Sequence, residues 1–461
     1  MLPKREGTLH SKPAKLSHQQ FEQALRYGRG NALIHVLNYG LDGIDELVLH
    51  ACLVSQAYDP QCEGHRAPWL YRMFQGTTLY QKFSAAIVEA LNRPSEEHSI
   101  EQLCELASRM AVGGDKAAAH ALRKFVWSQP YTSEDFPCGC NAIVLLDGLP
   151  AVIELARRLG NILLQNPDDY VGSLFWLTEG TPHYDSAIEE LGRASIGDDA
   201  IAAYLARERE EIAKREADAN ESLEQKAARF EKRRNEYLIE FPVERIFSMA
   251  SAPASNRPYP YSRFGRMARE ADLDLILRRI ETENDPEICR RLMWVFRRAT
   301  PPRTPACIWA FAESRDLPMR EATLRMLANI SDPKVGEFGR KMLRRSSFAP
   351  EDSDLIELLA RNYQPGDAEL ILRKLESVTT SDDGLHTLGM SARQFCENNP
   401  VPEVAGIARW IYDTTPCSLC RKGAVETLIA CNQLPDYIAE ECRYDANEET
   451  QSIVIEVSGA H

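Results

Sequence analysis

The sequence predicts an all-α protein with an α-solenoid of stacked helix pairs in the C-terminal half, an irregular helical N-terminal half and one long charged helix. Apolar residues recur three and four positions apart through most of the chain, which is the period of an amphipathic helix. Helix-start patterns return at a nearly constant interval in the C-terminal half. The 461 residues exceed one ordinary globular core, and 44% hydrophobic with 26% charged residues is typical of a folded chain.

The N-terminal half is expected to begin with a flexible tail. Residues 1–17 are polar and contain two prolines, so little in this stretch favours a fixed structure. Helical spacing then dominates over residues 18–198. A clear case is the amphipathic segment Phe83 to Leu91, which is followed by Asn92-Arg93-Pro94. We therefore predict an irregular helical domain over 18–198.

A charged segment follows this domain. From residue 199 to about 240 turn-forming residues are almost absent, while Glu, Lys, Arg and Ala are frequent. We therefore predict one long, solvent-exposed helix over 199–250. Residues 251–262 are rich in Pro and Ser and are not compatible with a continuous helix. We interpret this stretch as a hinge and as the main domain boundary.

A repeat begins after this hinge and defines the predicted solenoid over 263–461. Helix-forming stretches start near Asp272, Pro305, Pro333, Gly366, Val401 and Pro435. These starts are separated by 33, 28, 33, 35 and 34 residues, and each interval has room for two helices and a short turn. A short helix pair buries its apolar face only by packing against neighbouring pairs, so a period of this length indicates a stack.

Three of the predicted second helices carry a common pattern. The segments are Asp285-Pro-Glu-Ile-Cys-Arg-Arg-Leu, Asp316-Leu-Pro-Met-Arg-Glu-Ala-Thr-Leu and Thr415-Pro-Cys-Ser-Leu-Cys-Arg-Lys-Gly-Ala-Val. An acceptor side chain and a proline suit the first turn of a helix, where backbone N–H groups lack partners. The pattern resembles the second helices of HEAT and armadillo-like repeats over about 272–445, and the N-terminal half resembles them loosely. The resemblance implies a curved, right-handed solenoid used for binding, and it implies no chemistry.

Charge is distributed unevenly along the chain. The formal net charge is −14, which disfavours non-specific binding to DNA or to anionic membranes. Residues 261–345 nevertheless carry 18 Lys+Arg against 12 Asp+Glu, whereas residues 346–461 carry 8 against 20. Two interpretations stay open for the basic segment: solvated helix faces with local salt bridges, or a site for a polyanion or an acidic partner.

Paired arginines are the candidate partner-binding residues. They are Arg278, Arg279, Arg290, Arg291, Arg297, Arg298, Arg344 and Arg345. Arg290 and Arg297 are seven residues apart, so they are expected on one helix face. The guanidinium group suits phosphate or carboxylate, and aligned faces would form a basic stripe. Trp294 and Trp309 lie nearby and are expected in the core.

Cysteine patterns provide the remaining candidates for chemistry. Cys417-x-x-Cys420 is half of a zinc-site pattern, but a second pair and a nearby histidine are missing from the sequence, so core packing is favoured. Cys138-Gly-Cys140 is one residue shorter than the usual redox spacing. The sequence contains no His-Glu-x-x-His, no Gly-x-Ser-x-Gly and no phosphate-binding glycine loop. We therefore predict no catalytic, metal-binding or cofactor-binding residue.

Three functional hypotheses follow. The first is a non-enzymatic scaffold or adaptor that binds another protein through the helical-repeat surface. The alternative is a nucleic-acid-binding protein that uses the basic segment 261–345, and the third is an enzyme with its site in the N-terminal half. No signal peptide and no apolar run of about 18 residues is present, so a cytoplasmic location with reduced thiols is expected and a membrane partner is not.

Overall fold

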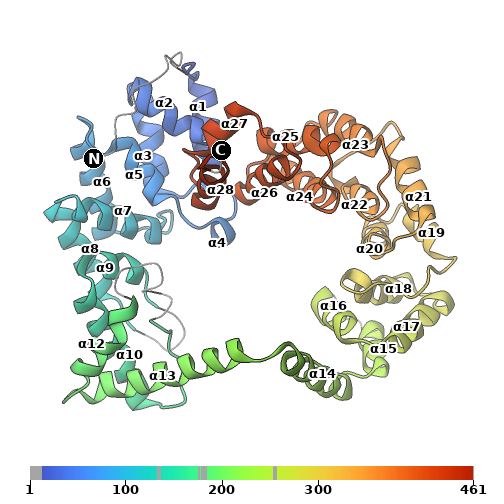
Figure 1. Ribbon diagram of the computed structural model, residues 1–461, viewed down its shortest axis with the longest axis horizontal. Coiled ribbons are helices and arrows are strands. Elements are labelled where there is room, and N and C mark those ends of the chain that lie inside the picture. Colours follow the sequence, from blue (N-terminus) through green and yellow to red (C-terminus); the bar gives the residue numbers. More distant parts are fainter. Residues whose placement is uncertain (1–12, 132–135, 175–176, 178–183, 253–256, 460–461) are drawn as a thin grey trace. The chain divides into compact units, whose positions relative to one another are not determined.

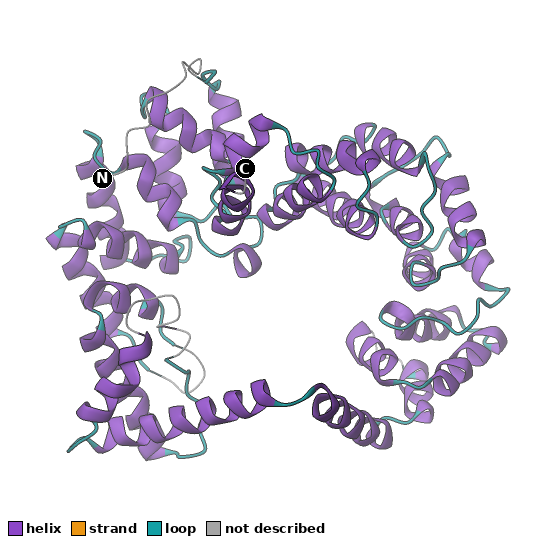
Figure 2. Ribbon diagram, viewed as in Figure 1, coloured by secondary structure: helices purple, strands orange, loops and turns teal. Residues whose placement is uncertain are grey.

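The structure is a computed structural model, and it describes residues 13–131, 136–174, 177, 184–252 and 257–459. Within these ranges the fold consists of helices and connecting loops, and no residue lies in a β-strand (Figure 2). The expected all-α class is therefore confirmed. None of the described helices combines the length and the apolar character needed to cross a membrane.

The chain divides into two compact units. Unit 1 contains residues 1–220 together with residues 436–461, and unit 2 contains residues 221–435. This division differs from the predicted domains at both ends of unit 2, because the last part of the expected solenoid packs within unit 1. Charge also separates between the units. Unit 2 carries 32 Lys+Arg against 31 Asp+Glu, and unit 1 carries the remaining 22 against 37. The net negative charge of the protein therefore lies in unit 1.

Unit 1 is a set of helices around one hydrophobic core, which extends from Phe21 to Leu205. Its helices are α1 His18–Tyr27, α2 Gly30–Tyr39, α3 Asp45–Leu53, α4 Pro60–Glu63, α5 Ala67–Phe74, α6 Tyr80–Asn92, α7 Ile100–Val112, α8 Lys116–Ser128, α9 Cys140–Asp147, α10 Leu149–Gln165, α12 Tyr184–Ala194, α13 Asp199–Asn220, α27 Asp436–Cys442 and α28 Glu448–Gly459 (Figure 1). The predicted helix at residues 83–91 lies inside α6.

The C-terminal helices complete unit 1 through specific contacts with its first helices. Arg29 forms a two-point ion pair with Glu441, with N–O distances of 2.8 and 3.0 Å. The indole N–H of Trp69 donates to the carbonyl of Tyr444 at 2.8 Å. A Cβ atom on Gly30 would lie 1.9 Å from the carbonyl oxygen of Glu441. The backbone of α2 therefore approaches that of α27 more closely than any side chain at position 30 permits.

Unit 2 consists of thirteen described α-helices and three short 3₁₀ helices. They are α14 Leu223–Glu240, α15 Val243–Ser251, α16 Pro258–Met267, α17 Glu270–Thr282, α18 Pro286–Met293, η1 Trp294–Arg297, α19 Ile308–Ala312, α20 Leu317–Leu327, α21 Pro333–Leu343, η2 Pro350–Asp352, α22 Asp354–Ala360, α23 Asp367–Glu376, α24 Asp382–Asn398, η3 Pro402–Val404, α25 Ala405–Thr414 and α26 Ser418–Ala430 (Figure 1).

Helices of unit 2 pack against helices that are close in sequence. α17 contacts α18, α19 contacts α20, α21 contacts α22, and α25 contacts α26. The second helix of one interval also contacts the second helix of the next, in the order α18, α20, α22, α24 and α26. The predicted start positions near 333, 366 and 401 fall within one residue of the observed starts of α21, α23 and η3.

The Asp and Pro residues of the repeat perform the expected capping role. Asp285 accepts a hydrogen bond from the backbone N–H of Glu287 at 2.8 Å, and Asp316 accepts one from Met319 at 3.2 Å. Prolines occupy the first turn of both helices, where a missing N–H has no cost. The sequence pattern thus predicted both the position and the chemistry of these helix starts.

The prediction of one long helix over 199–250 is wrong. The segment forms α13, α14 and α15. Ser222 caps α14 by accepting from the N–H of Gln225, whose side chain in turn accepts from the N–H of Ser222. Pro242 precedes α15 and has no N–H to continue α14. Ser222 and Gln225 lie in a segment rich in charged residues, and their capping box was not predicted from the sequence.

The predicted hinge at 251–262 and the predicted tail lie partly outside the described residues. Residues 1–12 belong to the tail and residues 253–256 to the hinge. α15 ends at Ser251 and α16 begins at Pro258, so helices occupy both flanks of this stretch. The division between the units falls at residues 220 and 221 instead, between α13 and α14.

Candidate functional site

The paired arginines of the basic segment have different surroundings. Arg278 and Arg279 are exposed and form ion pairs one helical turn away, with Asp274 and Glu283. Arg345 is exposed and lies 3.5 Å from a carboxylate oxygen of Glu313. Surface ion pairs of this kind contribute little to stability, and they neutralise the cations they involve. These positions match the interpretation of solvated faces with local salt bridges.

Arg291 has a structural environment. Its side chain is buried, and its guanidinium donates to the backbone carbonyls of Ala250 and Ala252 at 2.8 and 2.9 Å. These carbonyls belong to the end of α15, where a helix leaves C=O groups without intrahelical partners. Arg291 therefore joins α18 to α15 and is not available to a partner molecule.

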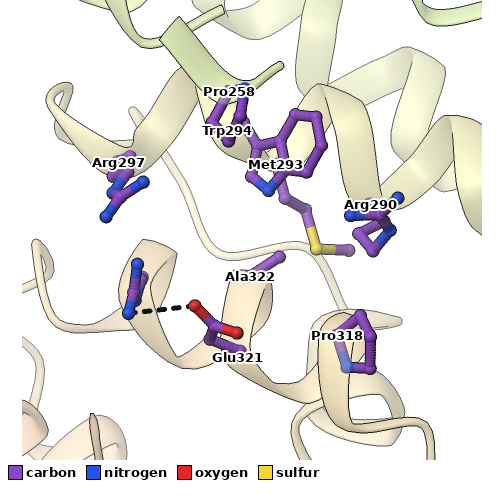
Figure 3. Close-up of a pocket in the computed structure, with 9 residues that line it drawn as sticks. Pro258, Arg290, Met293, Trp294, Arg297, Pro318, Glu321 and Ala322 are labelled. Carbon is purple, nitrogen blue, oxygen red and sulfur yellow. Dashed lines mark ion pairs between the residues drawn. The ribbon is translucent and has the colours of Figure 1, made fainter. Parts of the chain in front are cut away.

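Arg290 lies in α18 and Arg297 in the following 3₁₀ helix η1, so the two do not share the face of one α-helix as expected, but both line one pocket. The pocket has a volume of about 220 Å³ and lies between α18 with η1 on one side and α20 on the other. Figure 3 shows Arg290 and Arg297 at opposite ends, with Met293 and Trp294 between them. Its lining residues are Pro258, Arg290, Met293, Trp294, Arg297, Pro318, Glu321, Ala322 and Arg325. We name this site the arginine pocket.

One end of the arginine pocket is held in place by stacking. The guanidinium of Arg290 lies 4.6 Å from the ring centroid of Trp294 and forms an ion pair with Glu287 at 2.6 Å. Trp294 in turn packs edge-on against the ring of Tyr261. Trp294 is only partly buried, so it belongs to the pocket wall and not wholly to the core as expected. These contacts fix the ring of Trp294 beside the guanidinium of Arg290.

The other end of the pocket carries Arg297. Its side chain makes neither a hydrogen bond nor an ion pair with the described residues. Partial burial lowers the pKa of Arg297 and the nearby charge of Arg325 adds to this, whereas the carboxylates of Glu321 and Asp354 oppose it. Arg325 is shared between Glu321 at 2.9 Å and Asp354 at 3.4 Å. The environment of Arg297 therefore favours an added anion.

Asp354 does not line the pocket but contacts Arg325, which does. Its carboxyl group is buried at the start of α22, and burial raises its pKa to about 6. Arg325 opposes that rise, whereas the carboxylates of Glu357 and Glu321 add to it. The cation of Arg325 is thus engaged by two acidic groups of the protein itself, while Arg297 is not.

The remaining two arginines lie outside this pocket. Arg298 is exposed and makes no hydrogen bond or ion pair with the described residues. Arg344 lines a separate hollow of about 360 Å³ beside the buried ion pair of Arg340 with Asp367. In the part of the chain that the structure describes, these arginines line two separate hollows or pair with local carboxylates. Arg325 and Glu321 were not predicted from the sequence, because Arg325 does not belong to an arginine pair.

Cys417 and Cys420 were interpreted from the sequence as core residues without a nearby histidine. In the structure a histidine lies beside both of them. His386 on α24 places its ring beside Cys417 and Cys420 at the start of α26. The ligating atoms of all three residues lie within 4.8 Å of one another. The hydrogen bond from the Cys420 thiol lowers the pKa of Cys417, and the His386 ring adds to that effect. The same pairing raises the pKa of Cys420.

Cys138 and Cys140 are near Cys104 but do not form a comparable group. Burial raises the pKa of Cys140 to about 12 and also raises the pKa of Cys138. Within the described residues, His386, Cys417 and Cys420 are the only group of three His, Cys, Asp or Glu side chains placed to hold a metal ion.

Comparison with known protein families, with curated proteins and with solved structures finds no match for this chain.

Proposed function

We propose that the protein is a non-enzymatic adaptor that binds a partner protein, and that unit 2 is a HEAT-like stack of helix pairs whose arginine pocket receives an acidic segment of that partner. The observation that carries the proposal is the state of Arg297. Among the described residues Arg297 has no ion pair or hydrogen bond of its own, and it lies at the edge of an apolar and aromatic surface. A carboxylate is the natural counterion for this group.

The size of the pocket supports recognition of a side chain. Sites for cofactors and drug-sized ligands usually have volumes of about 300–1,000 Å³. The arginine pocket, at about 220 Å³, is smaller and suits one or two side chains. Met293 and Trp294 offer apolar contact in its middle, and Arg290 and Arg297 stand at its ends. A peptide with an apolar residue flanked by Asp or Glu has the complementary shape and charge.

The distribution of cations favours an acidic protein over a nucleic acid. A nucleic-acid backbone requires a track of unpaired cations spaced along its phosphates. In the basic segment, Arg278, Arg279 and Arg303 are engaged with carboxylates of unit 2. A local cation beside an apolar surface fits a single acidic side chain better than a polyanion.

Peptide binding to the purified full chain tests this proposal. The probe is a labelled synthetic peptide with glutamates on both sides of one leucine, measured by fluorescence anisotropy. Arg297→Glu reverses the charge that faces the peptide's carboxylate, so it should weaken binding by tenfold or more, which corresponds to about 1.4 kcal/mol. Arg298→Glu is the matched control, because it makes the same charge change one residue away and outside the pocket. Equal weakening by both variants would contradict a role for the pocket.

Purification from the native cells distinguishes protein from nucleic acid. A protein that accompanies the wild-type chain and the Arg298→Glu variant, but not the Arg297→Glu variant, supports the adaptor proposal. The alternative, nucleic-acid binding through residues 261–345, predicts material that nuclease removes and an affinity that falls steeply with salt. That result would replace the proposed function.

A further inference from the structure

A thiol–imidazole cluster lies in unit 2, on elements that do not contribute to the arginine pocket. Cys417 immediately precedes α26, and Cys420 lies in its first turn. His386 comes from the neighbouring helix α24, which contacts α26 directly (Figure 1). Cys420 Sγ lies 3.6 Å from His386 Nδ1. The two cysteines are almost fully buried, whereas His386 is partly exposed.

The geometry of this cluster corresponds to three corners of a tetrahedral metal site. Zinc binds thiolate sulfur at about 2.3 Å and imidazole nitrogen at about 2.0–2.1 Å, which places neighbouring ligand atoms about 3.5–3.8 Å apart. The observed separation of Cys420 Sγ and His386 Nδ1 is 3.6 Å, and no pair of ligating atoms in the cluster exceeds 4.8 Å. An ion would need only a small closure of the side chains.

The backbone that carries the two cysteines is fixed from both sides. Arg421 is buried and donates to the carbonyl of Pro416 at 3.2 Å. Arg393 on α24 donates to the carbonyl of Leu419 at 3.2 Å. These contacts hold the turn in which the cysteines lie, as the surrounding residues of metal sites commonly do. Two thiolates and one divalent cation sum to zero charge, so the neighbouring arginines do not oppose such a complex.

Ordinary core packing explains this cluster less well. A cysteine that acts as a small apolar residue is surrounded by apolar groups. Cys396, which is buried in α24, illustrates that case, because it belongs to no metal-binding group among the described residues. At Cys420 an imidazole nitrogen faces the sulfur instead. The residue types are those that zinc and other thiophilic ions prefer.

We propose that His386, Cys417 and Cys420 bind one zinc ion that links α24 to α26 and retains an open fourth coordination position. Both sulfurs bind as thiolates, so a thiol that is still protonated releases its proton as its Zn–S bond forms. Three protein ligands with one open position allow a water molecule or a partner's side chain to complete the tetrahedron. The site joins neighbouring helix pairs of unit 2 and is independent of the arginine pocket.

Metal titration of the full chain tests this inference. The purified protein is stripped with chelator under reducing conditions and titrated with Co²⁺ in the absence of oxygen. We expect one Co²⁺ per chain, with thiolate-to-cobalt charge transfer and the strong visible absorption of tetrahedral cobalt, and displacement by Zn²⁺. Cys417→Ser and Cys420→Ser should remove the charge-transfer bands, and the affinity should fall by about 100-fold or more, since even outer-shell changes cost 10–100-fold.

Two further variants make the result decisive. His386→Asn changes a partly exposed residue, so it should preserve the fold while weakening Co²⁺ binding and altering its spectrum. The double variant Cys396→Ser/Cys431→Ser removes two other cysteines of the same helices and should bind Co²⁺ as the wild type does. Absence of stoichiometric Co²⁺ binding, or equal loss in this control, would overturn the proposal. So would a Cys417–Cys420 disulfide in protein alkylated at the moment of cell lysis, which would indicate a redox pair.

Discussion

Units 1 and 2 are both helical, but the contacts within unit 1 differ in kind from the contacts within unit 2. In unit 2 each helix packs mainly against helices of its own or the next interval, about 30 residues away. In unit 1 the first and last helices of the chain meet, and Arg29 pairs with Glu441 across 412 residues of sequence. Unit 2 is nearly neutral, whereas unit 1 carries a charge of −15.

This difference shows which structural features can be predicted from a single sequence. In unit 2 helices contact other helices that are close in the sequence, so local capping residues and apolar spacing already indicate much of the packing. A unit closed by distant segments depends on surface complementarity that has no period.

Gly30→Ala should cause the largest loss of stability, and the loss should occur in unit 1. The added methyl group would lie 1.9 Å from the carbonyl oxygen of Glu441, so α2 and α27 would have to separate. We expect a loss of about 3 kcal/mol or more in the free energy of unfolding, measured by denaturant titration.

The matched control for this change is Gly192→Ala in α12. Its nearest neighbour atom would lie 3.7 Å from the new Cβ, which is ordinary contact. Replacing a helical glycine by alanine should then stabilise unit 1 by up to about 1 kcal/mol. If Gly30→Ala were as harmless as this control, the close approach of α2 to α27 would be refuted.

Arg291→Met should destabilise unit 2 by about 2–3 kcal/mol, because two backbone carbonyls at the end of α15, one of them on a buried residue, would lose a charged hydrogen-bond donor. Methionine keeps much of the apolar stem, so the loss reports the hydrogen bonds. Arg278→Met removes only an exposed ion pair and should change stability by less than about 0.5 kcal/mol. Similar effects of the two variants in a denaturant titration would count against the structural role of Arg291.

Asp354→Asn should change how the stability of unit 2 depends on pH. The pKa of Asp354 is about 6 in the fold, above its ordinary value near 3.8, so the folded state resists its ionisation. Wild-type stability should therefore fall relative to the variant as pH rises from 4 through 6, by about 1–2 kcal/mol in total. Unfolding midpoints at several pH values measure this. Glu351→Gln, on an exposed side chain nearby, should show no such pH-dependent difference.

Asp285→Ala should have the smallest effect in this series. It removes the acceptor for the N–H of Glu287 and should cost about 1 kcal/mol, the usual value for an N-cap. Asp285→Ser keeps an acceptor at the same position and should restore most of the loss. A thermal unfolding series on the three proteins is sufficient, and failure of serine to restore stability would argue against capping.

The sequence predicted the parts of the protein that are governed by local chemistry. Asp285 and Asp316 begin helices because an acceptor and a proline satisfy the first turn. The capping box at Ser222 was also present in the sequence, but it was obscured by the surrounding charged residues.

Other features depended on packing and were not predictable from one sequence. The place of residues 436–461 in unit 1 rests on long-range contacts such as that of Trp69 with Tyr444. His386 precedes Cys417 by one helix pair and follows no metal-site spacing, so only the contact of α24 with α26 reveals the cluster. Arg325 joins the arginine pocket because α20 packs against α18, which spacing within one helix does not indicate.

The most direct test of the two-unit account is hydrogen exchange of the full chain under increasing denaturant, followed by mass spectrometry of its peptides. The account predicts that peptides from residues 436–459 lose protection together with those from α1 to α3, although these segments lie at opposite ends of the sequence. Peptides from residues 221–435 should form a separate group. If residues 436–459 instead exchanged together with α25 and α26, the closure of unit 1 by the C-terminal helices would be contradicted.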